Sequence, residues 1–383
     1  MKIAQVAPLQ ESVPPKAYGG TERVVHYLTE ALVHQGHDVT LFASADSRTS
    51  ARLQAIVPAA LRLSSEKRDP LPWQMMQLAQ VSSVAENFDI IHFHTDFLHF
   101  PLWRKMRTPH VTTLHGRLDL PDLKPLFTEF RDMPVISIAD HQRNPLPMAH
   151  WTDTVYNGIP VDLYDFQAEA GDYLAFLGRI SPEKGAEAAI EIALRADMPL
   201  KMAAKIDVVD REYFEARIRP RLDHPLIEYI GEVDEQGKNE LLGGAKALIF
   251  PIAWPEPFGL VMIEAMACGT PVIAYRRGSV AEVMKDGVTG YIVESEEQAV
   301  SAIVRIDRID RGVCRSYFEH NFSSDLMARN YVNVYQKLII QQENTLPGTG
   351  TYRLNRLKNR TMPQGTVWKQ PLAAASAGVS DKL

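Results

Sequence analysis

The sequence predicts an α/β protein with two domains, each built around a parallel sheet. Short apolar runs typical of buried strands alternate with helical patterns along most of the chain, and such alternation predicts parallel sheets covered by helices on both faces. The 383 residues are enough for two hydrophobic cores. A turn-rich break at residues 155–162 interrupts the alternation near the middle. We therefore place the domain boundary between about residues 157 and 172.

The first domain opens like a nucleotide-binding fold. A strand is expected at residues 2–7, a loop with Gly19 and Gly20 follows, and a helix at about 21–35 leads to a second strand at 39–43. The loop lacks the Gly-x-Gly-x-x-Gly spacing, which excludes a dinucleotide fingerprint. From these residues alone, a plain tight turn explains the two glycines equally well.

Three histidines lie near the carboxyl ends of the next expected strands, where parallel sheets collect their ligands. The expected strands and helices of this part are 89–93, 97–106, 110–114, 120–130 and 135–138. His92 and His94 share one strand face and suggest a metal pair, but no third ligand is evident. We favour a structural or cleft-lining role for both. His115 follows the next strand directly.

Two cations follow the first strand of the second domain. The strand is expected at residues 173–178, and Arg179 and Lys184 come just after it, before a helix. Phosphates bind at such a point, and Arg and Lys are the side chains that hold them. The alternative is a pair of surface cations on a solvated loop. Two cations at this position, with Glu264 further along, favour phosphate binding.

The most informative stretch is residues 251–271. A strand at 247–250 precedes it, prolines at 251, 255 and 257 exclude regular structure, and a helix apolar on all sides is expected at 260–267. An unpaired carboxylate at Glu264 inside that helix would cost several kcal/mol. A sugar diol could supply its hydrogen-bond donors while the helix start binds a phosphate. Two other arrangements are together equally consistent: Glu264 pairs with a core Arg or Lys, or it lies on a small exposed stripe of the helix.

The run Glu-Pro-Phe-Gly-Leu-Val-Met-Ile-Glu-Ala-Met-Ala-Cys-Gly-Thr-Pro-Val-Ile-Ala occupies residues 256–274. With its Glu256-x7-Glu264 spacing, it resembles the signature of the retaining GT-B glycosyltransferases of family GT4, the glycosyl transferases group 1. The resemblance covers roughly the first 340 residues, with its strongest motifs in the second half. It implies a GT-B fold, in which two Rossmann-like domains face each other across a cleft.

The resemblance also implies an activity: transfer of a hexose from a nucleotide diphosphate sugar to an unidentified glycan, lipid or small-molecule acceptor, with retention and without a metal or other cofactor. It implies that Arg179, Lys184, Glu256 and His115 serve catalysis. The residues implied in donor binding are Gly19, Gly20, Gly231, Val233, Phe258, Gly259, Leu260 and Glu264. One departure is visible, because Ala203, Ala204 and Lys205 replace glycines that many members carry.

Three alternatives remain: a non-catalytic nucleotide-sugar-binding protein, a GT-B epimerase and a phosphorylase. The Glu-Pro-Phe-Gly motif disfavours the epimerase, and no context for a pyridoxal-binding lysine favours the phosphorylase. A degenerate binding protein would be expected to lack some site residues, yet Arg179, Lys184, Glu256 and Glu264 are all present.

The expected domains are residues 1–157 with a returning helix at 323–341, on the acceptor side, and residues 158–322, which bind the donor. Residues 344–383 form an expected disordered basic tail. This tail carries a net charge of +5, so the rest of the chain carries −11 of the total of −6. An acidic body argues against nucleic acid as a partner, whereas the basic tail suits peripheral contact with an anionic membrane.

Composition points to the cytoplasm. The mean hydropathy is −0.17, and no apolar run reaches the length of a membrane span. The N-terminus enters a strand without a signal-peptide pattern. The two cysteines, Cys268 and Cys314, allow at most one disulfide.

Overall fold

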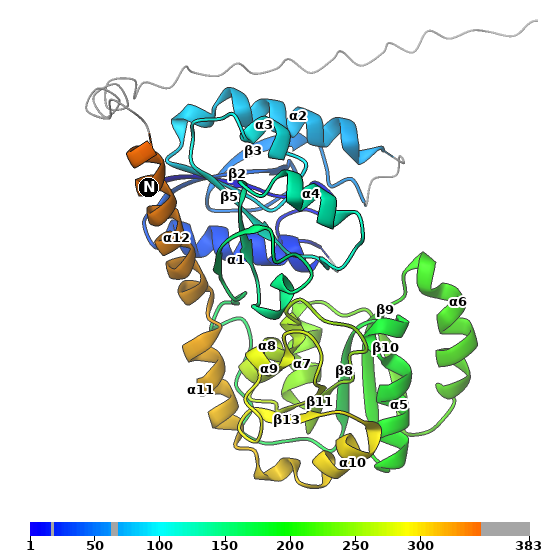
Figure 1. The fold of residues 1–383 in the computed structure, drawn as a ribbon. Helices are drawn as coiled ribbons and strands as arrows, with labels where there is room; N and C mark the ends of the chain where they lie inside the picture. Colours follow the sequence, from blue (N-terminus) through cyan, green and yellow to red (C-terminus); the bar gives the residue numbers. More distant parts are fainter. Residues whose placement is uncertain (17–18, 63–67, 346–383) are drawn as a thin grey trace, which may run out of the picture. The chain divides into compact units, whose positions relative to one another are not determined.

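Two parallel sheets carry the fold in the computed structural model, which describes residues 1–16, 19–62 and 68–345 (Figure 1). Residues Met1–Ile339 form one compact unit that contains both sheets, and the remaining residues form a second unit. The expected disordered tail lies almost wholly outside the described residues. The two sheets confirm the predicted α/β class.

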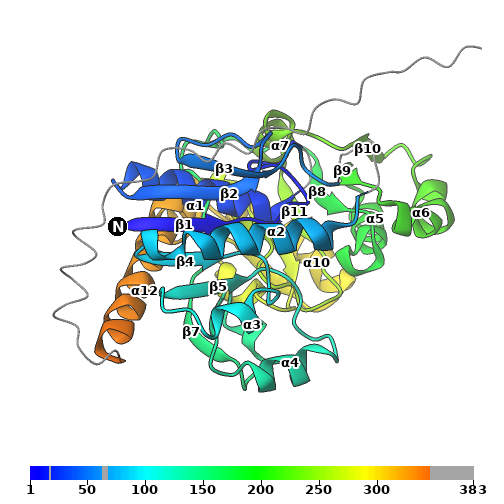
Figure 2. The same ribbon diagram turned by 90° about the horizontal axis from the view of Figure 1, so that it is seen from above.

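The first sheet has seven parallel strands in the order β3-β2-β1-β4-β5-β6-β7. The central strands are apolar and buried on both faces, as expected where helices cover a parallel sheet (Figure 2). The strands are β1 (Lys2–Val6), β2 (Asp38–Ser44), β3 (Arg52–Val57), β4 (Ile90–Phe93), β5 (His110–Leu114), β6 (Pro134–Ser137) and β7 (His150–Thr154).

The helices of this part are α1 (Gly20–His34), α2 (Pro70–Ser83), α3 (Phe100–Trp103) and α4 (Leu123–Glu129), with short 3-10 turns at Ala85–Asn87 and His141–Arg143. Sequence patterns did not predict β3, β7 or α2. The edge strand β3 is half exposed and has mixed polarity, and α2 keeps large apolar side chains in solvent. The helix expected at 97–106 is only α3, because tight i to i+3 turns follow Trp103.

The second sheet has six parallel strands in the order β10-β9-β8-β11-β12-β13. They are β8 (Leu174–Arg179), β9 (Leu200–Lys205), β10 (Ile227–Gly231), β11 (Ala247–Phe250), β12 (Val272–Tyr275) and β13 (Gly290–Val293). The longer helices around it are α5 (Ala186–Arg195), α7 (Glu235–Gly243), α8 (Leu260–Ala267), α10 (Glu296–Val304) and α11 (Arg311–Asn321). Short helical segments include α6 (Arg211–Tyr213), a π-helical turn at Phe214–Ile218 and α9 (Val280–Val283). The predicted bounds of the apolar helix α8 are confirmed.

The last helix, α12 (Ser324–Thr345), returns to the first sheet. Its Tyr331 and Tyr335 are fully buried, and their hydroxyls bond to side chains of β1, β4 and β5. An isolated parallel β-bridge pairs Ile159 with Ser323, the residue directly before α12. The division of the chain into domains at residues 157 and 158 stays a prediction.

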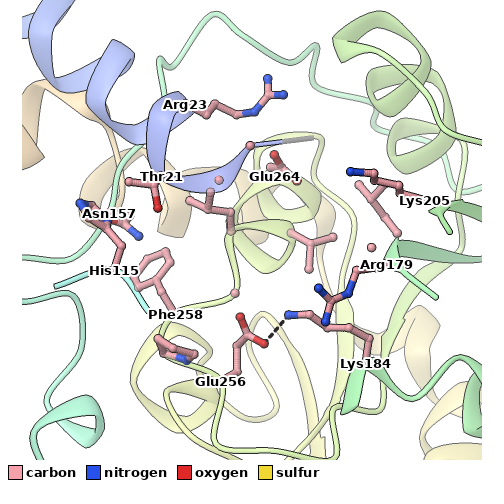
Figure 3. A pocket seen from close by; sticks show the side chains of 18 of the residues that line it. Thr21, Arg23, His115, Asn157, Arg179, Lys184, Lys205, Glu256, Phe258 and Glu264 are labelled. Carbon is pink, nitrogen blue, oxygen red and sulfur yellow. Dashed lines mark hydrogen bonds and ion pairs between the residues drawn. The ribbon is translucent and has the colours of Figure 1, made fainter. Parts of the chain in front are cut away.

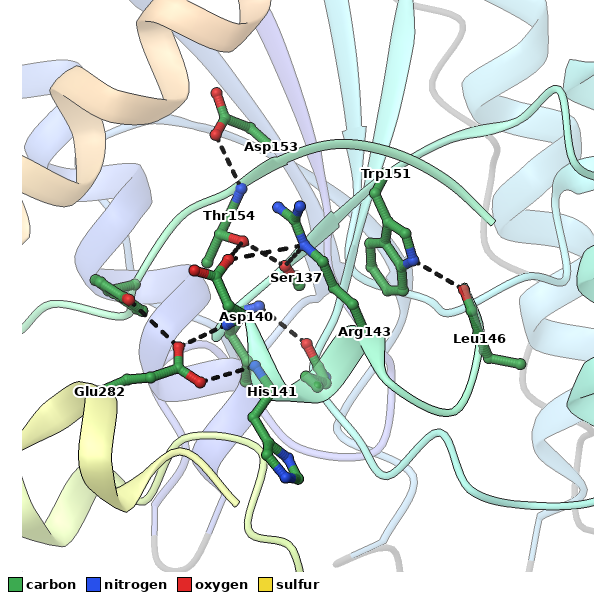
Figure 4. A network of polar contacts seen from close by, with 12 residues as sticks. Ser137, Asp140, His141, Arg143, Leu146, Trp151, Asp153, Thr154 and Glu282 are labelled. Atoms are coloured by element: carbon green, nitrogen blue, oxygen red, sulfur yellow. Dashed lines mark hydrogen bonds and ion pairs between the residues drawn. The ribbon is translucent and has the colours of Figure 1, made fainter. Parts of the chain in front are cut away.

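A polar network joins α9 to the loop after β6 (Figure 4). The Glu282 carboxylate accepts hydrogen bonds from the backbone N–H groups of Asp140 at 2.6 Å and His141 at 2.7 Å. The hydroxyl of Tyr156 donates to the same carboxylate at 3.3 Å. Glu282 therefore ties the second sheet's helices to the first sheet.

No helix among the described residues combines the length and the apolar character that crossing a membrane requires.

Candidate functional site

A cavity of about 640 Å³ opens at the carboxyl ends of strands from both sheets (Figure 3). Eleven of the twelve predicted site residues line it, namely Gly19, Gly20, His115, Arg179, Lys184, Val233, Glu256, Phe258, Gly259, Leu260 and Glu264. Gly231 is the exception: it ends β10, and its neighbours Glu232 and Val233 line the wall instead. The fold thus brings together residues from loops that are far apart in the sequence.

Lys184 and Glu256 form an ion pair at the cavity floor. The Lys184 Nζ lies 2.6 Å from Glu256 Oε2, and the indole N–H of Trp254 donates to the same oxygen at 2.8 Å. The Lys184 ammonium also lies over the Trp254 ring, 5.3 Å from its centroid. Most of both charged side chains is buried, so solvent screens the pair only weakly.

Two glycines allow the backbone conformation and the close packing of the loops that carry Lys184 and Glu256. Gly185 and Gly278 both have left-handed backbones, with φ of 75° and 55°. A Cβ at Gly185 would collide with the backbone oxygen of Pro251, and one at Gly278 would collide with the backbone of Glu256. Both positions require glycine for conformation and for space.

Arg179 faces three carboxylates. It bonds to Glu183 and lies 3.6 Å from Asp207 and 3.3 Å from Asp210. Burial tends to raise the pKa of Asp207, but the hydrogen bond and charge of Lys205 and the charges of Arg62 and Arg179 outweigh it and lower that pKa. The protein's own acids therefore surround the guanidinium.

Glu264 has a cation partner on the inner face of α8. The Lys238 ammonium lies 3.1 Å from Glu264 Oε1, and the Tyr164 hydroxyl lies 3.4 Å from the same oxygen. Lys238 also contacts Glu235, which in turn bonds to Arg23. The alternative considered from the sequence, a core cation beside Glu264, is therefore correct, and the same carboxylate also reaches the cavity.

The start of α8 faces the same cavity. Gly259 at its N-terminus has a φ of 77°, and no side chain among the described residues caps the helix there. Free N–H groups at a helix start, with the positive end of the helix dipole, favour an anion.

His115 stands across the cavity on the loop after β5. Its Nε2 lies 2.9 Å from Nδ1 of His94. Burial lowers the pKa of His115 to about 4, so the imidazole is neutral near pH 7. His92 is fully buried and bonds to Tyr335 and Thr113, so its role is structural, as favoured from the sequence.

Sequence reasoning missed several residues that line the cavity, among them Thr21, Arg23, Asn157, Lys238 and Trp254. The sequence did carry a signal for Asn157, because this residue precedes Gly158 at the turn-rich break. In the structure its buried Oδ1 has no hydrogen-bond partner among the described residues. Lys238 and Arg23 lie on amphipathic helices and look like ordinary surface cations. Only the packing of α1, α7 and α8 brings Lys238 to Glu264 and Arg23 to Glu235.

The described residues contain no group of three or more His, Cys, Asp or Glu side chains arranged to hold a metal ion.

Two family models match the chain. The model for Glycosyltransferase Family 4 matches residues 18–145, and that for Glycosyl transferases group 1 matches residues 166–309. The chain belongs to the group 1 glycosyltransferases. Both matched segments of this glycosyltransferase contribute residues to the cavity.

Curated relatives of this glycosyltransferase span nearly its whole described length. It is 25% identical over 350 residues to the phosphatidyl-myo-inositol mannosyltransferase of Mycobacterium leprae, covering 83% of this chain and 90% of the relative. It is 26% identical over 391 aligned positions to an uncharacterized glycosyltransferase of Methanocaldococcus jannaschii, covering 88% of this chain and 98% of the relative.

Solved structures confirm the predicted GT-B fold. The sucrose-phosphate synthase of Thermosynechococcus elongatus matches with a TM-score of 0.74 and 19% identity, covering 89% of this glycosyltransferase and 100% of the neighbour. An Anabaena protein, HepE, solved with UDP and glucose, matches with a TM-score of 0.69 and 16% identity, covering 88% and 100%.

Proposed function

We propose that this glycosyltransferase moves a sugar from a nucleotide diphosphate sugar to a hydroxyl acceptor with retention at the anomeric carbon. One observation carries the proposal: Arg179, Lys184 and the uncapped start of α8 share a cavity with two carboxylates, Glu256 and Glu264. That combination provides positive charge for a diphosphate and hydrogen-bond acceptors for the hydroxyls of two sugars.

In the proposed complex, the diphosphate lies between Arg179, Lys184 and Gly259. Its negative charge displaces the acids that these cations contact in the free protein. Glu264 accepts hydrogen bonds from the ribose, while Lys238 keeps a second partner in Glu235. Glu256 holds hydroxyls of the transferred sugar, and His115 approaches that sugar from the opposite wall.

The proposed step breaks the bond between the anomeric carbon and the diphosphate oxygen and forms a bond from that carbon to the acceptor oxygen on the same face. The proton of the acceptor hydroxyl passes to the departing diphosphate. Charge grows on the leaving oxygens, where Arg179, Lys184 and the α8 dipole stabilise it. No residue is assigned as a nucleophile, and no metal or other cofactor is part of the proposal.

The relatives support a sugar-nucleotide donor but favour no single base. A structural neighbour was solved with UDP and another with ADP, whereas the mycobacterial relatives are named as mannosyltransferases of phosphatidyl-myo-inositol. We leave the acceptor as a glycan, a lipid or a small molecule. If the acceptor is a lipid, we propose that the protein is cytoplasmic and binds the inner face of the membrane through its basic tail.

Donor hydrolysis without acceptor tests the proposal against a non-catalytic binder. The protein is incubated with UDP-, GDP- and ADP-sugars, and the release of nucleotide diphosphate and of free sugar is followed by chromatography. We expect slow release from one donor, the donor whose nucleotide also raises the melting temperature, and none from Lys184→Ala. Stabilisation by a donor without any release would favour the binding protein, and no stabilisation by any nucleotide would contradict the proposal.

A further inference from the structure

A chain of hydrogen bonds runs from the cavity into the core of the first sheet. It starts at His115, whose Nε2 lies 2.9 Å from His94 Nδ1. The opposite nitrogen of His94, Nε2, lies 2.7 Å from the side-chain oxygen of Gln5. The amide nitrogen of Gln5 donates to the hydroxyl of Tyr335 at 3.2 Å. Beyond it the chain continues through His92 and Thr113 to Tyr331.

The donors and acceptors of this chain fit one direction. The Gln5 oxygen can only accept, so His94 Nε2 carries a proton and donates it. In a neutral imidazole the other nitrogen is then an acceptor, so His94 Nδ1 accepts from the Nε2–H of His115. The only ring nitrogen of His115 left without a proton is Nδ1.

Burial restricts the orientations that these side chains can adopt. Gln5 and His92 are fully buried, His94 is 3% exposed, and both tyrosines are 0% exposed. A buried polar group without a hydrogen-bond partner has lost its hydration and gained nothing in return, which is energetically costly. Each side chain of the chain is therefore held in the orientation that keeps its hydrogen bonds. Burial also holds the pKa values of His92 and His94 well below the usual range, which keeps both rings neutral.

The hydrogen-bonded chain connects β1, the end of β4 and the last helix. Gln5 lies on β1, His94 directly follows β4, and Tyr335 lies on α12, 330 positions after Gln5. No member other than His115 lines the cavity. Their contacts therefore concern the support of His115 and not the binding of a ligand.

We propose that His94 and Gln5 are positioning residues that hold His115 as its Nε2–H tautomer and present the unprotonated Nδ1 to a hydroxyl of the donor sugar. The inference about the sugar rests on the proposed function. The tautomer itself is a property of the ligand-free protein. His115 is then an acceptor for the sugar, as Glu256 is from the other wall.

Nitrogen NMR of the intact, ligand-free protein tests the tautomer without any assay of transfer. The histidines are labelled with 15N, and the signals of His94 and His115 are assigned by comparison with His94→Asn and His115→Ala. We expect both residues to show a protonated Nε2 and an unprotonated Nδ1. Protonated Nδ1 on both residues would mean that the chain runs the other way, and a mixture of tautomers at His115 would mean that nothing fixes it. Either result overturns the proposal.

Kinetics of matched variants test the consequence for the reaction. In His94→Phe the Nε2–H of His115 loses its acceptor, so we expect kcat to fall about tenfold or more while the donor KM stays within about threefold. In His94→Asn the amide oxygen can take the place of Nδ1, and we expect most of kcat to return. Equal losses of kcat in the two variants would contradict positioning.

His99→Phe is the control for loss of a buried imidazole. His99 is fully buried directly before α3 and bonds to Thr112 of β5 at 2.8 Å, outside the chain that leads to His115. We expect its kcat to stay near wild type, and a loss equal to that of His94→Phe would overturn the proposal. If the protein transfers no sugar at all, the proposed function fails while the NMR result still decides the tautomer.

Discussion

The ammonium of Lys184 lies 2.6 Å from the carboxylate of Glu256, and the same carboxylate accepts a hydrogen bond from Trp254. Both side chains of this ion pair are largely buried, and both line the cavity. A bound donor would place the negative diphosphate beside Lys184 and the sugar hydroxyls beside Glu256. The pair therefore keeps both side chains oriented and compensates their charges until the substrate takes over these contacts.

Lys184→Ala should lower kcat by about 10²- to 10³-fold, the loss typical for removal of one group that stabilises charge in a transition state. Steady-state kinetics with the donor identified by the hydrolysis screen measure the effect. Lys246→Ala is a control for loss of an ion-paired lysine, because Lys246 pairs with the more exposed Asp307 at 2.8 Å and does not line the cavity. Equal losses in the two variants would remove Lys184 from the reaction.

Glu264→Ala and Glu256→Ala should separate nucleotide binding from sugar orientation. Glu264 is proposed to bind the ribose, which free nucleotide diphosphate also contains, so its loss should weaken that nucleotide about tenfold to a hundredfold. Lys238 still has Glu235 as a partner in this variant, so the fold should persist. Glu256→Ala should leave nucleotide affinity intact and reduce turnover.

Calorimetry with nucleotide diphosphate on both variants decides between these roles. Nucleotide affinity lost in Glu256→Ala and kept in Glu264→Ala would reverse the two assignments. If neither variant changes binding or turnover, the nucleotide binds elsewhere.

Activity should survive EDTA. Arg179, Lys184 and the start of α8 already provide the positive charge that a metal ion would bring to the diphosphate. The test compares turnover before and after treatment with the chelator and removal of the chelated metal. Complete loss that magnesium or manganese restores would show that these groups are insufficient.

Gly278→Ala should disturb the Glu256 loop, because its methyl group would collide with the Glu256 backbone and its φ of 55° is left-handed. We expect a lower melting temperature and a loss of kcat. Gly287→Ala is the control: its φ is 73°, but apart from its chain neighbours no atom of the described residues lies within 4 Å of the added methyl group. In that variant the free energy of unfolding should fall by about 1–2 kcal/mol, the cost of a left-handed backbone at alanine, and kcat should stay normal. Similar kcat in both variants would show that the Glu256 loop tolerates the displacement.

Stability should fall as the pH drops from about 6.5 towards 4. Burial lowers the pKa values of His110 and His115 to about 4 and holds those of His92, His94 and His99 well below their usual value. The unfolded chain binds these protons near pH 6.5 and the folded chain does not, so acid favours unfolding. Each such histidine contributes up to about 1.4 kcal/mol per pH unit in that window.

Thermal unfolding at pH 7.5 and pH 5 measures this dependence. His99→Phe removes one of these five imidazoles with lowered pKa values and should make the loss of melting temperature on acidification smaller. An unchanged difference between the two pH values would show that His99 is not neutral in the folded protein at pH 5.

The sequence by itself determined the α/β class, the apolar helix 260–267 and eleven of the residues that line the cavity. These features depend on local signals: a strand followed by a Gly- or Pro-rich loop and then a helix must place its loop at the carboxyl edge of a parallel sheet. Glu264 stood out because a carboxylate inside an all-apolar helix violates the pattern around it.

Only the tertiary structure decided which side chains became partners. Lys238 and Arg23 look like surface cations in sequence. The packing of α1, α7 and α8 decides that Lys238 contacts Glu264 and Glu235 and that Arg23 contacts Glu235. The support of His115 by His94, Gln5 and Tyr335 likewise joins β4, β1 and α12 across more than 300 positions. A hydrogen bond needs two groups within about 3 Å, and local patterns carry no information about which distant side chains meet at that range.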